Sequence, residues 1–236
     1  MASYVTAQQL ILRVRQRTNL ENATTFIPDS EILDCLNGSL ANEVYDLLRQ
    51  SVGDNYYRQK FTFHTSQGVY NYLLPSDLLT DISVDVWFGG QFPYSARRYA
   101  EADRNVLRGV PFGWGPAYPL FYQLQGSGVN ASISLVCGTP IAGVQVDLNY
   151  VPVCPTLVNM NDVFDDINGW SEIAVLDAGV KVCIKDGSFD TATFLEQRKA
   201  TLVAKVRAMG PQRHAGEPEC VNMIAGRVEP GDGWYD

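Results

Sequence analysis

The stretch PDSEILDCLNGSLANEVYDLL, residues 28–48, carries the clearest helical pattern in the chain. Pro28, followed by Asp29, Ser30 and Glu31, is typical of a helix start, because proline fits the first turn and acidic side chains complement the helix dipole there. Apolar residues then recur at spacings of three and four, at Ile32, Leu36, Leu40, Val44 and Leu47 or Leu48. We therefore predict a helix that ends near Gly53 and buries this apolar face.

An earlier helix is predicted to start at Thr6, because Thr6 and Gln9 have the spacing of a capping box. The helical period places Leu10, Ile11 and Val14 on the buried face. The three arginines of this segment are expected to remain largely in water as a solvated face, and not to form a nucleic-acid patch: Arg13, Arg15 and Arg17.

The pattern changes to strand-like alternation near Tyr57. Phe61, Phe63 and Thr65 share one face, Ser66-Gln67-Gly68 is a turn, and the residues that return as the second half of a predicted hairpin are Val69, Tyr70 and Tyr72. Four further strands are predicted at 82–88, 120–125, 132–137 and 144–150. Between them we expect a short helix at 99–107 and a loop at 109–119. Short strands separated by glycine turns predict a small β-sandwich or barrel.

Helical spacing resumes near Gly169 and continues through Trp170, Ile173, Ala174, Leu176, Val180 and Ile184. Asp186-Gly187-Ser188 breaks this helix, and a last helix follows through Phe194, Leu195, Leu202, Val203, Val206 and Met209. The two helices are expected to be antiparallel. Residues 210–236 contain eight Gly and Pro residues and no helical period, so they predict an arm that becomes ordered only when something binds it.

Together these patterns predict an α+β fold. Residues 1–58 and 156–209 would form a helical bundle, residues 59–155 an inserted β domain, and residues 210–236 an extended C-terminal arm. The start of the chain has no basic segment followed by an apolar one, and no stretch reaches the roughly 18 apolar residues of a spanning helix. Five cysteines without a Cys-x-x-Cys pair indicate a reducing compartment at synthesis. We expect a protein that is neither secreted by that route nor embedded in a membrane.

The net charge is −8, which opposes a static grip on DNA but is compatible with DNA passing nearby. Nucleotide-binding loops are absent, and His64 and His214 stand far apart in the sequence, so no His-based metal site or catalytic set can be assembled. The acidic group Asp162, Asp165 and Asp166 favours a solvated helix-entry loop over a cation site, because it lacks the ligand order of a calcium loop. The sequence thus predicts no enzyme, cofactor or metal.

Several segments together resemble the head-to-tail adaptor proteins of tailed bacteriophages. The resemblance rests on Leu12-Arg13-x-Arg15-x-Arg17, Phe26-Ile27-Pro28-Asp29-Ser30-Glu31-Ile32-Leu33-x-x-Leu36-Asn37, Val44-Tyr45-Asp46-Leu47-Leu48, Tyr70-x-Tyr72-x-Leu74-Pro75-x-Asp77-Leu78 and the helices between Trp170 and Met209. It implies a dodecameric ring beneath the portal protein, with the β insertion facing tail or nozzle proteins and the arm reaching toward the portal. Double-stranded DNA would pass through the ring without sequence-specific binding. Such a protein is made in the bacterial host cytoplasm and ends in the virion, at the head-to-tail interface.

The arm also supplies the predicted partner-binding residues, because apolar side chains without a core of their own are suitable anchors: Val221, Met223, Ile224, Trp234 and Tyr235. Three other functions remain open at this point. A neck or tail-completion ring would also be an assembly protein, the aromatic-rich insertion could be a carbohydrate-binding module, and the acidic loop could serve a hydrolase.

Overall fold

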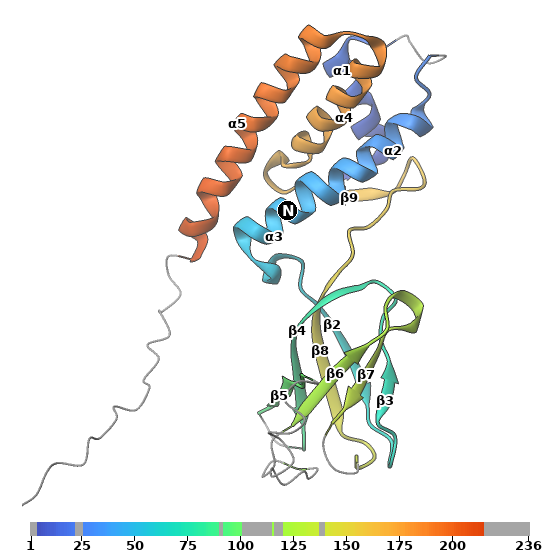
Figure 1. The fold of residues 1–236 in the computed structure, drawn as a ribbon, viewed down its shortest axis with the longest axis vertical. Coiled ribbons are helices and arrows are strands. Elements are labelled where there is room, and N and C mark those ends of the chain that lie inside the picture. The colour runs from blue at the N-terminus through green and yellow to red at the C-terminus, as the bar shows by residue number, and fades with distance from the viewer. Residues whose placement is uncertain are drawn as a thin grey trace, which may run out of the picture.

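The computed structural model describes residues 4–21, 26–89, 92–100, 115, 120–136 and 140–214, with side chains up to residue 209. Helices gather at one end of this structure and a curled sheet lies at the other (Figure 1). We call residues 4–57 and 153–214 the helical part and residues 58–152 the β part. The predicted α+β class is confirmed.

Helix α1 (Ala7–Thr18) begins with the predicted capping box. The Thr6 hydroxyl accepts the Gln9 backbone N–H at 3.2 Å, and the Gln9 side chain accepts the Thr6 N–H at 3.1 Å. The apolar face is buried as predicted. The expectation that Arg15 lies in water is wrong, because Arg15 is 6% exposed and its guanidinium donates to the Ile27 carbonyl at 2.8 Å and the Asp29 carboxylate at 2.6 Å.

The predicted second helix is a continuous rod made of α2 (Asp29–Ser39), a π-helical turn (Leu40–Tyr45) and α3 (Asp46–Val52). It ends at Gly53, whose φ of 99° is accessible to glycine and strained for other residues, so the predicted end is confirmed. The whole predicted apolar face is buried: Ile32, Leu36, Leu40, Val44, Leu47 and Leu48. The sequence pattern did not reveal the π-helical turn.

Helix α4 (Ser171–Asp186) and helix α5 (Phe189–His214) are antiparallel (Figure 1), as predicted. The break between them is confirmed, because Gly187 caps α4 with a φ of 82°. Helix α5 continues to His214, beyond the predicted last helical residue Met209.

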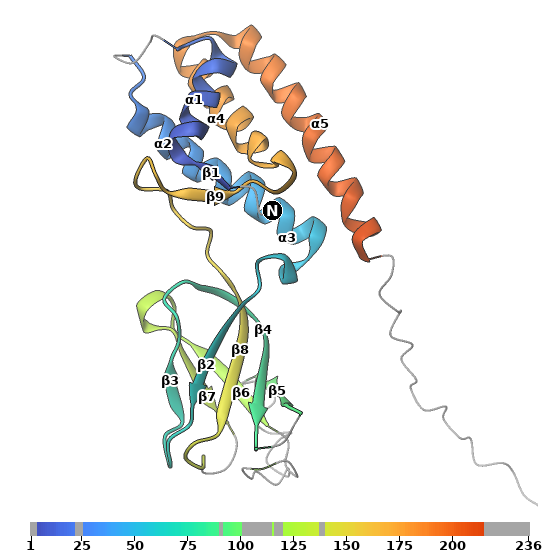
Figure 2. The ribbon, with the colours of Figure 1, turned by 180° about the vertical axis from the view of Figure 1, so that it is seen from behind.

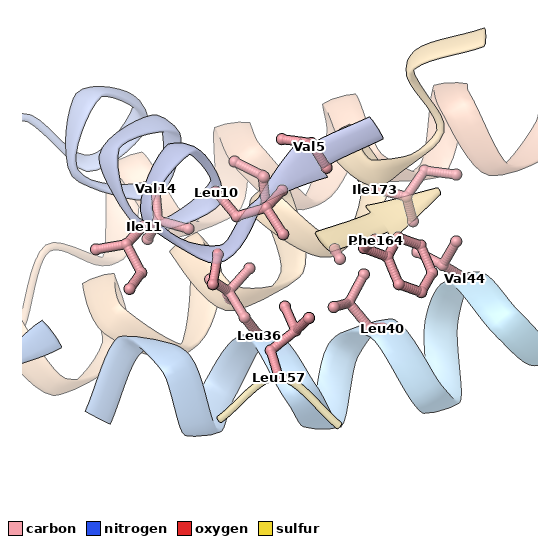
Figure 3. Packing of buried hydrophobic residues seen from close by; sticks show 14 of the residues in the cluster. Val5, Leu10, Ile11, Val14, Leu36, Leu40, Val44, Leu157, Phe164 and Ile173 are labelled. Atoms are coloured by element: carbon pink, nitrogen blue, oxygen red, sulfur yellow. The ribbon is translucent and has the colours of Figure 1, made fainter. Parts of the chain in front are cut away.

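A small sheet that the sequence did not predict joins the two halves of the helical part. Strand β1 (Tyr4–Thr6) pairs antiparallel with β9 (Val163–Asp165), and Val5 lies opposite Phe164. These two residues point into the core, where Val5 and Phe164 meet Leu10, Leu36 and Leu40 (Figure 3). The apolar core therefore includes side chains from both ends of the sequence.

The β part has seven strands, whose bounds are β2 (Gln59–His64), β3 (Asn71–Leu73), β4 (Leu78–Trp87), β5 (Tyr94–Arg98), β6 (Phe121–Gln125), β7 (Ser132–Leu135) and β8 (Gln145–Pro152). Their order is β2-β8-β4-β5-β6-β7-β3, and all neighbours are antiparallel except β5 and β6. Strands β4, β6, β7 and β8 correspond to the four further predicted strands, whereas β5 was not predicted.

The predicted hairpin is wrong in its pairing. Strand β2 pairs with β8 and strand β3 pairs with β7, so the two segments form opposite ends of the strand order. The sheet curls and brings these ends near each other, with the rings of Phe63 and Tyr72 4.8 Å apart. The Tyr72 hydroxyl also accepts the Ser66 backbone N–H at 2.9 Å. Side chains, and not a ladder of backbone hydrogen bonds, thus join β2 to β3.

Some predictions concern residues outside the described ranges. These are the short helix from residue 101 onward, most of the loop at 109–119, and the arm beyond residue 214. Within the ranges that are described, no helix has both the length and the apolar character needed to cross a membrane.

Candidate assembly surfaces

The acidic segment before α4 is held by backbone and side-chain contacts. The Asp162 carboxylate accepts the backbone N–H of Asn159 at 2.8 Å and that of Val158 at 2.7 Å. These bonds lower the pKa of Asp162, because they stabilise the charged carboxylate. The Ala7 N–H also donates to the Asp162 carbonyl at 2.9 Å. Asp162 thus organises a rigid turn beside the start of α1.

Asp165 and Asp166 have structural partners as well. Asp165 accepts the Ile167 N–H at 3.1 Å. Asp166 accepts the Ser171 hydroxyl at 2.6 Å and pairs with Arg13 at 3.3 Å. Among the described residues, no group of three or more His, Cys, Asp or Glu side chains could hold a metal ion. These carboxylates connect the turn, α1 and the start of α4.

The histidines considered as catalytic candidates belong to different elements. His64 ends strand β2 in the β part, and His214 is the last residue of α5 in the helical part. The structure therefore does not bring them into one site.

A buried ionic network fixes α5 against the other helices. Asp177 on α4 accepts from Lys199 of α5 at 2.9 Å, from Lys181 at 2.8 Å and from the Ser39 hydroxyl at 2.7 Å. Burial by itself would raise the pKa of Asp177, but these donors lower it overall. Ser39 directly precedes the π-helical turn, so the network links α2, α4 and α5 at the point where the rod changes its helical period.

An apolar groove of about 440 Å³ lies between α4 and α5. We call it the α4–α5 groove; its lining includes Val180, Ile184, Phe189, Ala192, Gln197 and Ala200. Ile184 is 54% exposed and Phe189 is 65% exposed. Ile184 and Phe194 belong to the apolar series that predicted these helices, yet both are exposed. Large apolar side chains gathered around a groove are typical of a surface that another chain covers.

A second apolar surface lies on the outer side of β1 and β9 and on the turn before β9. We call it the β1–β9 surface; it consists of Tyr4, Val158, Met160, Val163 and Ile167. Val158 is 72% exposed and Tyr4 is 65% exposed. The alternation of the two strands turns these residues outward, because their neighbours Val5 and Phe164 point inward.

The β part has a polar hollow of about 420 Å³, lined by Lys60, His64, Trp87, Gly89, Gly143, Gln145 and Asp147. Asp147 is 3% exposed and accepts from Thr62 at 2.7 Å, Lys60 at 2.9 Å, Gln145 at 3.0 Å and Trp87 Nε1 at 2.8 Å. Burial would raise the pKa of Asp147, but the four donors together lower it to about 2. The carboxylate therefore holds its four neighbours in place on the outer face of the sheet.

A family model described as SU10 adaptor protein matches residues 5–211. The chain belongs to this SU10 adaptor protein family. The match runs from β1 through most of α5 and includes the whole β part. The resemblance to phage adaptors is thereby confirmed, and the chain is a structural bacteriophage adaptor and a virion component. None of the curated proteins compared with it matches.

The adaptor's predicted partner-binding residues are not among those that the structure describes. Val221, Met223, Ile224, Trp234 and Tyr235 all follow residue 214, and the family match ends before them. Sequence reasoning missed the β1–β9 surface, because nothing local indicates that Tyr4 and Val163 share one face. The exposure of Phe189 beside Gly187 offered a weak signal, since an apolar residue in a helix-breaking segment lies outside the helical period.

Proposed function

We propose that this adaptor forms a ring, a dodecamer by resemblance, between the portal protein and the tail of a bacteriophage. The ring keeps a passage open for double-stranded DNA and closes the joint against leakage. The observation that carries the proposal is the pair of apolar surfaces on a helical part stiffened by buried ionic contacts, in a chain of a phage adaptor family. Its mechanism is the formation of interfaces.

The proposed division of labour follows the sequence. Residues 1–58 and 156–209 build the wall of the ring, residues 59–155 face tail or nozzle proteins, and residues 210–236 reach toward the portal. The chain is made in the host cytoplasm and is incorporated at the head-to-tail interface. A net charge of −8 supports a passage that does not retain DNA, because a negative wall repels phosphates.

The arm is proposed to dock on the portal through Val221, Met223, Ile224, Trp234 and Tyr235. Burying one such side chain contributes roughly 1.5–3 kcal/mol, so two or three anchors can offset the entropy lost when a short segment becomes ordered.

Mass photometry of the full chain, alone and mixed with the portal protein, tests the ring. We expect particles of ring size in at least the mixed sample. Monomers in both samples would contradict the proposal. A neck or tail-completion ring would instead assemble with tail proteins and leave the portal unbound, so a parallel mixture with tail proteins separates the two functions.

Truncation after His214 tests the arm. We expect an unchanged melting temperature, because α5 ends at His214, together with weaker retention of the portal in a pull-down. A variant with Trp234→Ala and Tyr235→Ala in the full-length chain is the matched control, since it keeps the length of the arm. Normal retention by both variants would remove the arm from the mechanism.

A further inference from the structure

We propose that the β1–β9 surface of one copy docks into the α4–α5 groove of the next copy. This inference rests on the proposed ring and specifies its subunit contact. It uses two different surfaces of the chain, which makes the contact heterologous. Repeating such a contact generates a closed ring or a filament, whereas a surface that pairs with itself generates a dimer and stops.

The two surfaces face different sides of the helical part. Helix α2 passes in front of β9 in Figure 1, and α4 is visible there between α2 and α5. From behind, in Figure 2, β1 and β9 lie in front of the helices. The close view in Figure 3 agrees, because β1, β9 and α1 lie in front of the other helices. A copy placed against the groove therefore leaves its own groove free for the following copy.

The shapes of the two surfaces complement each other. The turn before β9 is convex and rigid, because Asp162 accepts two backbone N–H groups within it and the Gln8 N–H donates to the Met160 carbonyl at 3.1 Å. The α4–α5 groove is concave and apolar, with Ile184 and Phe189 exposed. A rigid apolar knob loses little conformational entropy when it enters an apolar groove.

Charge also favours this pairing. Helix α1 has no acidic residue, and its Arg13 and Arg17, with side chains 37% and 38% exposed, lie beside the β1–β9 surface through their contacts with Asp166 and Glu172. Glu196, whose side chain is 52% exposed, lines the α4–α5 groove, and Asp190 lies in the first turn of α5. A guanidinium has five N–H donors, so each arginine can keep its partner in the same copy and contact an acid of the next. Basic and acidic groups thus flank the two surfaces on opposite sides of the interface.

Site-directed cross-linking tests the contact. Two full-length variants, Met160→Cys on the turn and Gln197→Cys in the groove, carry different tags and are assembled separately and together, with the portal where assembly requires it. A short bismaleimide is then added, and the wild type is treated in parallel to measure cross-linking through native cysteines. We expect a new product that joins positions 160 and 197 of two copies in the mixed sample, and none above the wild-type level in either variant alone.

A second pair of variants measures the energy of the contact. Phe189→Asp places a charge at the groove and should weaken assembly at least about tenfold, equivalent to about 1.4 kcal/mol. Phe92→Asp in the β part is the matched control, because Phe92 is 77% exposed and lies outside both surfaces. Both variants should melt like the wild type, since both side chains are exposed.

The outcomes separate this inference from the proposed ring. Ring-sized particles without the 160–197 product, or with assembly unchanged in Phe189→Asp, would overturn the subunit contact and leave the ring intact. Cross-linking of Met160→Cys with itself would show a self-pairing surface. If truncation after His214 frees the groove for a cysteine reagent at position 197, the arm occupies the groove and the inference is wrong. Monomers under all conditions would overturn both proposals.

Discussion

The helical part and the β part differ in where their buried polar groups point. In the helical part, Arg15 and Asp177 connect elements that are distant in the sequence or belong to different helices. In the β part, Asp147 and Asn149 lie on the outer face of the central strand β8 and are covered by side chains of the neighbouring strands. The helical part uses polar contacts to fix helices against one another, which leaves apolar side chains for its outer surface. The β part uses them to cover its own sheet.

The apolar cores differ as well. The main core of the helical part and the core of the β part share no residue among those described. The parts meet where the Tyr45 hydroxyl donates to the Pro152 carbonyl and the Tyr45 ring stacks on Tyr57 at 4.0 Å between centroids. A change in one core should therefore reach the other part weakly.

The largest expected effect is that of Leu40→Ala. Leu40 is 0% exposed in the helical core, so its truncation should lower the free energy of unfolding by about 2–5 kcal/mol. Hydrogen exchange read by mass spectrometry should show lower protection in α4 and unchanged protection in β8. The matched variant is Leu12→Ala, since Leu12 is 53% exposed on α1 and its truncation should change stability by less than about 0.5 kcal/mol. Equal loss of protection in β8 would show that the two parts unfold as one unit.

A smaller loss is expected for Arg15→Leu. This change leaves the buried Ile27 carbonyl without its guanidinium donor and Asp29 without its partner, and Asp29 is already 49% exposed. We expect a loss of about 2–3 kcal/mol in urea unfolding. Arg17→Leu is the control, because the pair of Arg17 and Glu172 lies nearer the surface and should contribute less than about 1 kcal/mol. Similar losses in the two variants would contradict the role of burial.

The smallest of the three effects concerns acid. The folded pKa of Asp147 is lowered to about 2, below the roughly 3.9 of an unfolded aspartate, so its stabilising contribution is complete above about pH 4 and is lost as the pH falls to 2. We expect Asp147→Asn to cost about 2 kcal/mol at neutral pH and to reduce the change in stability across this window. Urea unfolding at several pH values measures both.

The control for acid is Asp85→Asn on strand β4, where the carboxylate accepts from the neutral groups of Ser83 and Asn149. This variant should keep the acid dependence of the wild type. If Asp147→Asn loses stability between pH 4 and pH 2 as steeply as the wild type does, Asp147 is not the group that titrates.

Much of the helical part could be predicted, because the deciding interactions lie within a few residues of one another. The Thr6–Gln9 capping box, the apolar period of 28–48 and the glycines at 53 and 187 act over one or two turns of helix. The candidate site was predicted less well. The exposed face of Ile184 follows the same period as a buried one, and a helical period does not say which side finds a partner.

By itself, the sequence determined the number and limits of the main helices, four of the strands and the family of adaptors, because capping, periodicity and turn chemistry are local. The tertiary structure decided that Arg15 is buried, that β1 pairs with β9, and that β2 pairs with β8 and not with β3. It also created both proposed assembly surfaces. The physical reason is that burial and strand pairing depend on which distant segments come together, and that choice minimises the free energy of the whole chain rather than of any short stretch of it.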